Sequence, residues 1–154
     1  MEPNRKLKLS WNSIHEGVEV LAHMVQPFKP ELIVGISRGG LIPATLLSHA
    51  LGLPMSVVNV KAYEGTRRTL QKPIVTDWRE AYNKPTTIVI DDIMDTGASW
   101  DAILYGDGRL GTMMQANLAT LVKKTKAAFT KHQTFFMQVP PEVWVQFPWE
   151  GEEL

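Results

Sequence analysis

The hydrophobic positions of this chain follow two patterns. Apolar side chains recur with a helical period from Trp11 to Val25, after Ser10 as a candidate N-cap, and a second helical segment runs from Leu41 to Leu51 and stops at Gly52. Short apolar runs predict four strands, at residues 31–36, 55–60, 86–90 and 117–122. Because helical segments separate most of these strands, we expect an α/β fold with a mainly parallel core sheet, flanking helices, and ligands bound beyond the carboxyl ends of the strands.

Two segments do not fit this alternation. Residues 63–84 are too long and too charged for an ordinary connection, which is typical of mobile lids and binding loops. A solvated excursion explains the same segment, and composition alone favours it. Residues 140–150 contain two tryptophans and three prolines near the end of the chain, and a tail packed on the core explains them most simply.

Composition limits the kind of protein and the kind of partner. With 154 residues, 44% of them hydrophobic and 21% charged, the chain is long enough for one globular domain. Its 16 basic and 16 acidic residues cancel, which favours a small-molecule partner over nucleic acid or an anionic membrane. The lack of cysteine excludes disulfides and thiolate metal sites. The N-terminus lacks the apolar core of a signal peptide, and no apolar run reaches the length of a membrane span, so we expect a soluble cytoplasmic protein.

The segment 87–99, TIVIDDIMDTGAS, carries the strongest functional signal. If the apolar run is a strand, Asp91 and Asp92 emerge at its carboxyl end, where carboxylates suit vicinal hydroxyls and a divalent cation. The turn Thr96–Ser99 then leads into a helix and presents backbone N–H groups and hydroxyls to a phosphate. A sugar phosphate satisfies both halves. For a lone Asp-Thr-Gly, an acidic turn that caps the next helix is the safer interpretation.

This arrangement of apolar residues, paired acids and Asp-Thr-Gly-Ala-Ser resembles the phosphoribosyl-pyrophosphate motif of type I phosphoribosyltransferases. Across the chain, the order of elements is most similar to the bacterial xanthine-guanine subfamily, through residues 10–11, 34–43 and 144–150. The resemblance implies a type I phosphoribosyltransferase-like fold in a single domain, residues 1–154. It also implies a flexible loop and a small C-terminal hood, with hood elements near the N-terminus and at residues 133–154.

For the sugar and its phosphates, the resemblance implies roles residue by residue. Asp91 and Asp92 would hold the ribose hydroxyls, with Asp92 as the residue near Mg²⁺, and Asp95 would lie near the purine N7; these three are the candidate catalytic residues. The 5′-phosphate would be surrounded by Asp95, Thr96, Gly97, Ala98 and Ser99. Ser37, Arg38 and Gly39 would form the diphosphate loop, with a non-proline cis peptide between Ser37 and Arg38. Arg67 or Arg68, in the flexible loop 63–84, would cap the diphosphate.

For the base, the resemblance implies contacts from the last part of the chain. Lys124 aligns with the lysine that meets the purine 6-oxo group, although Lys123 is its neighbour and only one of the two can point inward. Trp144 would stack on the base, with a plain core tryptophan as the alternative, and backbone groups near Val145 would read the base edge. Gln146 aligns with an acidic residue that reads the 2-substituent.

The implied activity is transfer of the 5-phosphoribosyl group from phosphoribosyl pyrophosphate to guanine, xanthine or hypoxanthine, with release of pyrophosphate. The ranking of these bases stays open. The resemblance further implies a homo-oligomer, dimer or tetramer. A regulatory protein that senses phosphoribosyl pyrophosphate or nucleotides is the alternative, supported only by a basic patch at Lys123, Lys124, Lys126 and Lys131. An acid-cluster phosphatase or metal protein is disfavoured, because the four histidines lack ligand spacing.

Overall fold

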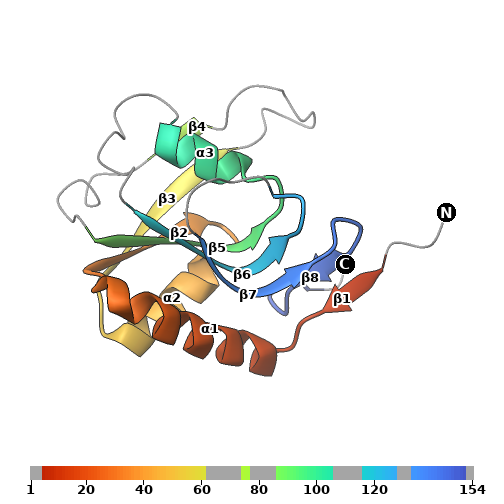
Figure 1. Cartoon of the computed structure of the whole chain (residues 1–154), viewed down its shortest axis with the longest axis horizontal. Helices are drawn as coiled ribbons and strands as arrows, with labels where there is room; N and C mark the ends of the chain where they lie inside the picture. Colours follow the sequence, from red (N-terminus) through yellow and green to blue (C-terminus); the bar gives the residue numbers. More distant parts are fainter. Residues whose placement is uncertain (1–4, 62–73, 77–85, 106–115, 128–132, 152–154) are drawn as a thin grey trace.

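Six strands form the central sheet of the computed structural model, which describes residues 5–61, 74–76, 86–105, 116–127 and 133–151 (Figure 1). Their order across the sheet is β4-β3-β2-β5-β6-β7, and all neighbours are parallel except the antiparallel pair β3 and β4. The bounds are β2 Leu32–Ser37, β3 Met55–Lys61, β4 Ile74–Thr76, β5 Thr87–Met94, β6 Asn117–Lys124 and β7 Gln133–Val139. The expected α/β fold with a mainly parallel sheet is confirmed.

Helices cover both faces of this sheet. Helices α1 (Trp11–Val25) and α2 (Leu41–Leu51) lie on one face and α3 (Ala98–Tyr105) lies on the other (Figure 1), while a short 3₁₀ helix, η1, spans Gln26–Phe28. The bounds predicted for the first two helices are confirmed. The Ser10 hydroxyl caps α1 by accepting from the Ser13 N–H at 3.1 Å, and Gly52 ends α2 in the left-handed conformation with φ 65°. Among the described residues, no helix has the length and apolar character needed to cross a membrane.

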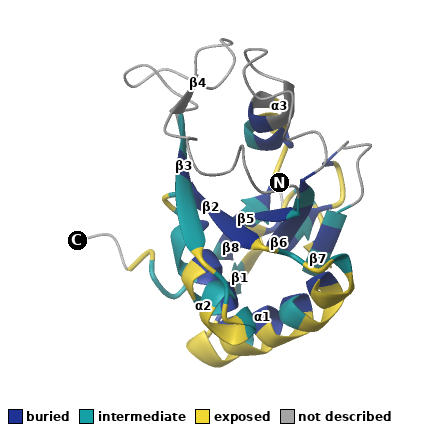
Figure 2. Cartoon of the chain, turned by 90° about the vertical axis from the view of Figure 1, so that its left-hand side faces the viewer, coloured by how far each residue is buried: buried dark blue, intermediate teal, exposed yellow. Residues whose placement is uncertain are grey.

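The core lies on both sides of the sheet. Ile14, Leu21 and Leu47 pack with Ile88 beneath α1 and α2, whereas Val89 faces the opposite cluster. Trp100 and Ile103 of α3 belong to that second cluster. Figure 2 shows the exposed residues of α1 and α2 on the sides that face away from the sheet. Because β5 is buried on both faces, its apolar run is continuous instead of alternating.

Strand β5 is longer than the sequence pattern predicts. The prediction ended it at Ile90, with both acids beyond its end, but the strand runs to Met94 and contains Asp91 and Asp92. Pairing with β2 stops at Gly35 opposite Ile90, whereas pairing with β6 continues to Met94. The two acids therefore lie in a part of the strand that has left β2, beside the loop that follows β2.

A second, two-stranded sheet lies beside the central one. Its strands β1 (Lys6–Lys8) and β8 (Trp144–Gln146) pair in parallel, so the beginning and the end of the chain meet. The sequence pattern did not predict these strands, nor β4 and β7. Strand β4 lies inside the segment 63–84, and β7 is the edge strand of the central sheet. The C-terminal hood was expected at residues 133–154. Because β7 belongs to the central sheet, only the described residues after Val139 lie outside that sheet.

Candidate active site

The loop between β2 and α2 is folded tightly against β5. A methyl group built on Gly40 would lie 2.6 Å from the carbonyl oxygens of both Ile36 and Ile90. A methyl group built on Gly39 would overlap the carboxylate of Asp92, and only glycine fits at either position. The peptide bond between Ser37 and Arg38 is cis, as the family resemblance implied. The loop backbone is thus held directly over the acidic part of β5.

The start of this loop is fastened to β3. The Ser37 hydroxyl donates a hydrogen bond to Oδ1 of Asn59, which is its register partner on the neighbouring strand. Asn59 was not among the residues predicted for the site. In the sequence, Asn59 stands out only as a polar residue between Val58 and Val60. Its contact with Ser37 follows from the register of β2 and β3, which the sequence does not reveal.

Asp91 and Asp92 form a crowded acidic pair. Asp91 Oδ1 accepts from the Asp92 N–H at 2.9 Å, and Asp92 Oδ1 accepts from the Ile93 N–H at 2.8 Å. Burial, followed by the negative charge of Asp92, raises the pKa of Asp91 well above its ordinary value. Burial also raises the pKa of Asp92, and the Glu150 carboxylate adds to this effect. The pair is therefore suited to a ligand that brings positive charge or hydrogen-bond donors.

The turn after β5 leads directly into α3. Gly97 has φ 84°, which is the left-handed region that favours glycine. The Thr96 hydroxyl accepts from the Ala98 N–H at 3.3 Å, and the Asp101 N–H donates to the Gly97 carbonyl at 2.9 Å to begin the helix. Asp95 and Thr96 are exposed and Ser99 is half-buried. The turn predicted to bind the 5′-phosphate thus lies at the positive end of a helix.

Strand β8 has one edge that β1 does not use. The Trp144 N–H donates to the Arg5 carbonyl at 2.7 Å, and the Gln146 carbonyl accepts from the Leu9 N–H at 2.9 Å. Because alternate residues of a parallel strand face opposite sides, the N–H and C=O of Val145 point away from β1. Trp144 beside it is 61% exposed, which excludes the alternative that this tryptophan is a core residue.

The side chain of Lys124 reaches the segment that directly precedes β8. Its ammonium donates to the Val143 carbonyl and, at 3.2 Å, to the Pro141 carbonyl, and the residue is buried. The ammonium of Lys123 instead lies 5.3 Å from the centre of the Phe135 ring. Lys124 is therefore the member of the pair that approaches the backbone next to Val145.

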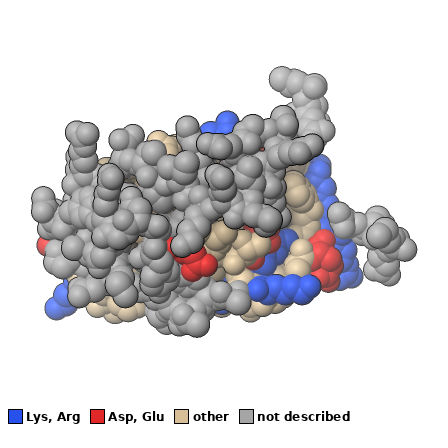
Figure 3. Space-filling view, turned by 90° about the horizontal axis from the view of Figure 1, so that it is seen from above, with Lys and Arg blue, Asp and Glu red and all other residues tan. Residues whose placement is uncertain are grey.

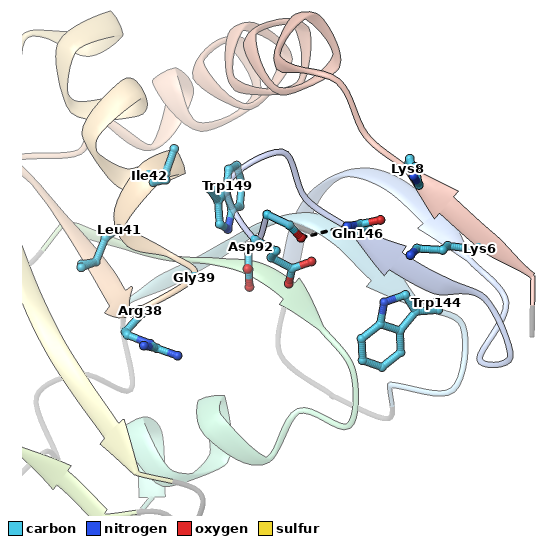
Figure 4. A pocket seen from close by; sticks show the side chains of 12 residues that line it. Lys6, Lys8, Arg38, Gly39, Leu41, Ile42, Asp92, Trp144, Gln146 and Trp149 are labelled. Carbon is cyan, nitrogen blue, oxygen red and sulfur yellow. Dashed lines mark hydrogen bonds between the residues drawn. The ribbon is translucent and has the colours of Figure 1, made fainter. Parts of the chain in front are cut away.

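A pocket of about 1050 Å³ connects these elements (Figure 4). Arg38, Gly39 and Asp92 line it from the central sheet, and Trp144 and Gln146 line it from the hood, all of which were predicted. Figure 3 shows basic and acidic side chains next to each other toward the end of the molecule where β1 and β8 lie. The sequence reasoning missed the other lining residues, which are Lys6, Lys8, Leu41, Ile42, Trp149, Glu150 and Gly151.

The tail after β8 closes one side of the pocket. Trp149 stacks on Phe147 with ring centres 4.8 Å apart, and a Glu150 carboxylate oxygen accepts from the Phe147 N–H at 3.0 Å. The Gln146 side-chain amide donates to the Gly151 carbonyl at 3.2 Å (Figure 4). Four other predicted residues, Ser37, Asp91, Lys124 and Val145, do not line the pocket, although three of them adjoin lining residues in the sequence. Asp95, Thr96 and Gly97 form the turn before α3, and Ala98 and Ser99 begin that helix. Arg67 and Arg68 lie outside the described residues.

Residues 10–150 match the model of the phosphoribosyl transferase domain, and the chain belongs to this family. The purine phosphoribosyltransferase from Pyrococcus horikoshii is 30% identical, with a TM-score of 0.80 and 97% of each chain covered. The xanthine-guanine phosphoribosyltransferase of Chromohalobacter salexigens is 27% identical over 96% of this chain and 85% of its own length. That of Idiomarina loihiensis is 25% identical over 96% of this chain and 88% of its own length.

Proposed function

We propose that this protein is a purine phosphoribosyltransferase of purine salvage, which transfers the 5-phosphoribosyl group of phosphoribosyl pyrophosphate to guanine, xanthine or hypoxanthine. One observation carries the proposal: a single pocket joins the Asp92 carboxylate, beneath the glycine loop, to the exposed ring of Trp144 in the hood. The first end suits a sugar diphosphate and the second suits a flat base. The regulatory alternative is not favoured, because the relatives above are named as transferases.

The sugar diphosphate would bind at the end of the pocket formed by the central sheet. Arg38 carries a forked guanidinium suited to phosphate oxygens, and the backbone around Gly39 faces the carboxylate of Asp92. Asp91 and Asp92 would accept hydrogen bonds from the ribose hydroxyls. The turn Asp95–Ser99 would hold the 5′-phosphate at the positive end of α3, and Arg67 or Arg68 would cap the diphosphate.

The donor set also fits Mg²⁺. The described residues contain no group of three or more potential ligands, but Mg²⁺ is commonly held by one or two carboxylates together with substrate oxygens and water. Asp92 lines the pocket and is buried, and a cation would offset the burial that raises its pKa, so it is the residue that would hold the ion. When bound, Mg²⁺ would neutralise charge on the diphosphate.

The purine would lie against Trp144 with its 6-oxo group toward Lys124. The N–H and C=O of Val145 point away from β1, and the Lys124 ammonium is hydrogen bonded to the carbonyl of Val143, which directly precedes β8. An ammonium and an amide N–H are donors, so this edge of β8 suits an oxo group and disfavours the 6-amino group of adenine. Gln146 would lie near the 2-substituent of the base.

The reaction exchanges one bond at C1′ for another. A purine ring nitrogen bonds to C1′ while the bond from C1′ to the diphosphate oxygen breaks, and the diphosphate leaves with the bonding electrons. The base gives up its N–H proton, and the acceptor would be the carboxylate of Asp95, which the family resemblance implies would lie near N7. The protein's own groups position the reactants, stabilise charge and exclude water, so no covalent protein intermediate is needed.

We further propose that residues 1–154 act as one domain, in the cytoplasm, in a homo-oligomer of two or four copies. Exposed Val20 and Met24 lie one turn apart on α1 and would be covered by a second copy. Light scattering at micromolar concentration tests this proposal, and a mass of one chain would contradict it.

Isothermal titration with phosphoribosyl pyrophosphate and Mg²⁺ tests the sugar end of the site. The wild type should bind, and Asp92→Asn should bind at least tenfold more weakly while keeping the same melting temperature within a few degrees. If both proteins bind phosphoribosyl pyrophosphate with equal affinity, Asp92 does not contact this ligand. If the wild type does not bind it, the proposed function is wrong.

A further inference from the structure

The face of the hood that looks into the pocket carries two lysines. Lys6 and Lys8 both line the pocket, while Leu7 between them is half-buried against the core. The register of the parallel pair places Lys6 opposite Trp144 and Lys8 opposite Gln146. Because alternate residues of a strand share a face, the four side chains form one surface with two positive charges.

The other charged groups around the pocket offset these lysines only in part, because three cationic side chains face two carboxylates. Arg38 and Asp92 come from the central sheet, at the end assigned above to the diphosphate and the ribose. Glu150 comes from the tail, where its carboxylate accepts from the Phe147 N–H, and its negative charge helps to raise the pKa of Asp92. Figure 4 shows the Lys6 side chain extending from β1 toward the pocket, between Gln146 and Trp144. A base that stacks on Trp144 would therefore lie next to an ammonium group.

We propose that Lys6, supported by the charge of Lys8, determines base specificity and favours xanthine over guanine; this inference rests on the function proposed above. The 6-oxo group is assigned to the Val145 edge of β8, so the 2-substituent lies toward the lysine-bearing face beside Gln146. Xanthine has an oxo group at this position, which accepts a hydrogen bond from an ammonium. Guanine has an amino group there, and it cannot hydrogen bond to the ammonium because both groups are donors. Hypoxanthine has only a hydrogen atom at this position.

Charge acts in the same direction as hydrogen bonding. Xanthine is a stronger acid than guanine or hypoxanthine, and a fraction of its molecules is anionic near neutral pH. An anion gains from nearby lysines more than a neutral base does, and the gain is larger in a pocket partly shielded from water. Both effects favour xanthine, and neither depends on Gln146 changing its hydrogen bond to Gly151.

The experiment measures kcat/KM for xanthine, guanine and hypoxanthine with the wild type, Lys6→Gln and Lys6→Arg. Wild type should prefer xanthine to guanine, and Lys6→Gln should lower the xanthine-to-guanine ratio about tenfold, mainly through KM for xanthine. Lys6→Arg keeps the charge and should restore most of the ratio. Arg5→Gln removes one positive charge from the residue before β1, whose side chain does not line the pocket, and should leave the ratio unchanged.

The outcomes separate this inference from the function beneath it. If the wild type transfers phosphoribosyl groups but Lys6→Gln keeps the wild-type ratio, the lysine does not read the base and the inference is wrong. A guanine preference that Glu150→Gln abolishes would assign specificity to the tail carboxylate and would also overturn it. Failure of the wild type to use any of the three bases would remove the proposed function itself.

Discussion

Gly39 lies directly against the carboxylate of Asp92. A methyl group added at Gly39 would overlap Oδ2 and lie 2.7 Å from Oδ1, so the loop after β2 and the acidic part of β5 are in contact without any intervening side chain. The carboxylate belongs to a buried residue and cannot move away freely. The loop proposed to bind the diphosphate and the carboxylate proposed to bind the ribose are therefore in contact at one glycine.

Gly39→Ala should lower kcat/KM for phosphoribosyl pyrophosphate by about 10²-fold, because displacing a positioned group by about 1 Å has an effect of that size. Gly52→Ala is the matched control: its φ of 65° disfavours alanine, but nothing lies within 4 Å of the added methyl group. The control should lose about 1 kcal/mol of stability and keep its activity. Equal activity of Gly39→Ala and wild type would show that Asp92 can move without consequence.

Asp91→Asn should separate stability from activity. The raised pKa of Asp91 means that folding favours its protonated form, so its contribution to stability is present in full below the ordinary value of 3.8 and is lost as the pH rises through the folded-state pKa. At pH 7 the ligand-free variant should therefore have an equal or higher melting temperature than the wild type, and the difference should disappear in acid. Its kcat/KM should fall by about 10²-fold.

The control for this variant is Asp101→Asn, which removes the same charge from an exposed position in the first turn of α3. It should lose a few tenths of a kcal/mol of stability and keep its activity, because an acidic side chain there stabilises the helix dipole. Thermal unfolding across pH and initial rates measure the two properties. A clear drop in the melting temperature of Asp91→Asn at pH 7, or undiminished turnover, would contradict the prediction.

The hydrogen bond from Ser37 to Asn59 should position the diphosphate loop. Asn59→Ala should raise KM for phosphoribosyl pyrophosphate about threefold to tenfold, in line with about 0.5–1.5 kcal/mol for one hydrogen bond. A cycle with Ser37→Ala tests the pairing, because the double variant should be little worse than either single one. Fully additive effects would show that the two side chains act independently.

Comparing Lys124→Met with Lys123→Met tests which lysine serves the base. The buried ammonium of Lys124 is hydrogen bonded beside Val145, whereas that of Lys123 lies over Phe135. Lys124→Met should lower kcat/KM for every 6-oxopurine by about 10–100-fold, and Lys123→Met should change it by less than about threefold. If Lys123→Met is the more damaging change, the alignment of these neighbours is shifted by one residue.

Local patterns predicted the parts of the fold that depend on local sequence. Helices α1 and α2 have the predicted bounds because helical period, the Ser10 cap and Gly52 act within a few residues. The predicted end of β5, at Ile90, was wrong because the last residues of this strand pair with β6, which is distant in the sequence. Strands β1 and β8 are each too short to recognise alone, and each exists by pairing with the other.

The residues of the candidate site likewise fall into those that the sequence could identify and those that it could not. Asp92 could be named from the sequence because its motif carries its own chemistry, and Arg38 could be named because its segment resembles the family's diphosphate loop. Lys6 and Asn59 could not, because their relation to the pocket and to Ser37 follows from strand register. Alternation along β6 established that only one of two lysines points inward, but the position of the hood was needed to identify it.

The most direct test of the account is product analysis with the wild-type protein, phosphoribosyl pyrophosphate and Mg²⁺. Guanine, xanthine, hypoxanthine, adenine and orotate are supplied in separate reactions, and nucleoside 5′-monophosphate and pyrophosphate are quantified together. The account predicts equal amounts of both products with at least one 6-oxopurine and very little of either with adenine or orotate. Efficient turnover of adenine or orotate, or no nucleotide from any 6-oxopurine, would contradict it.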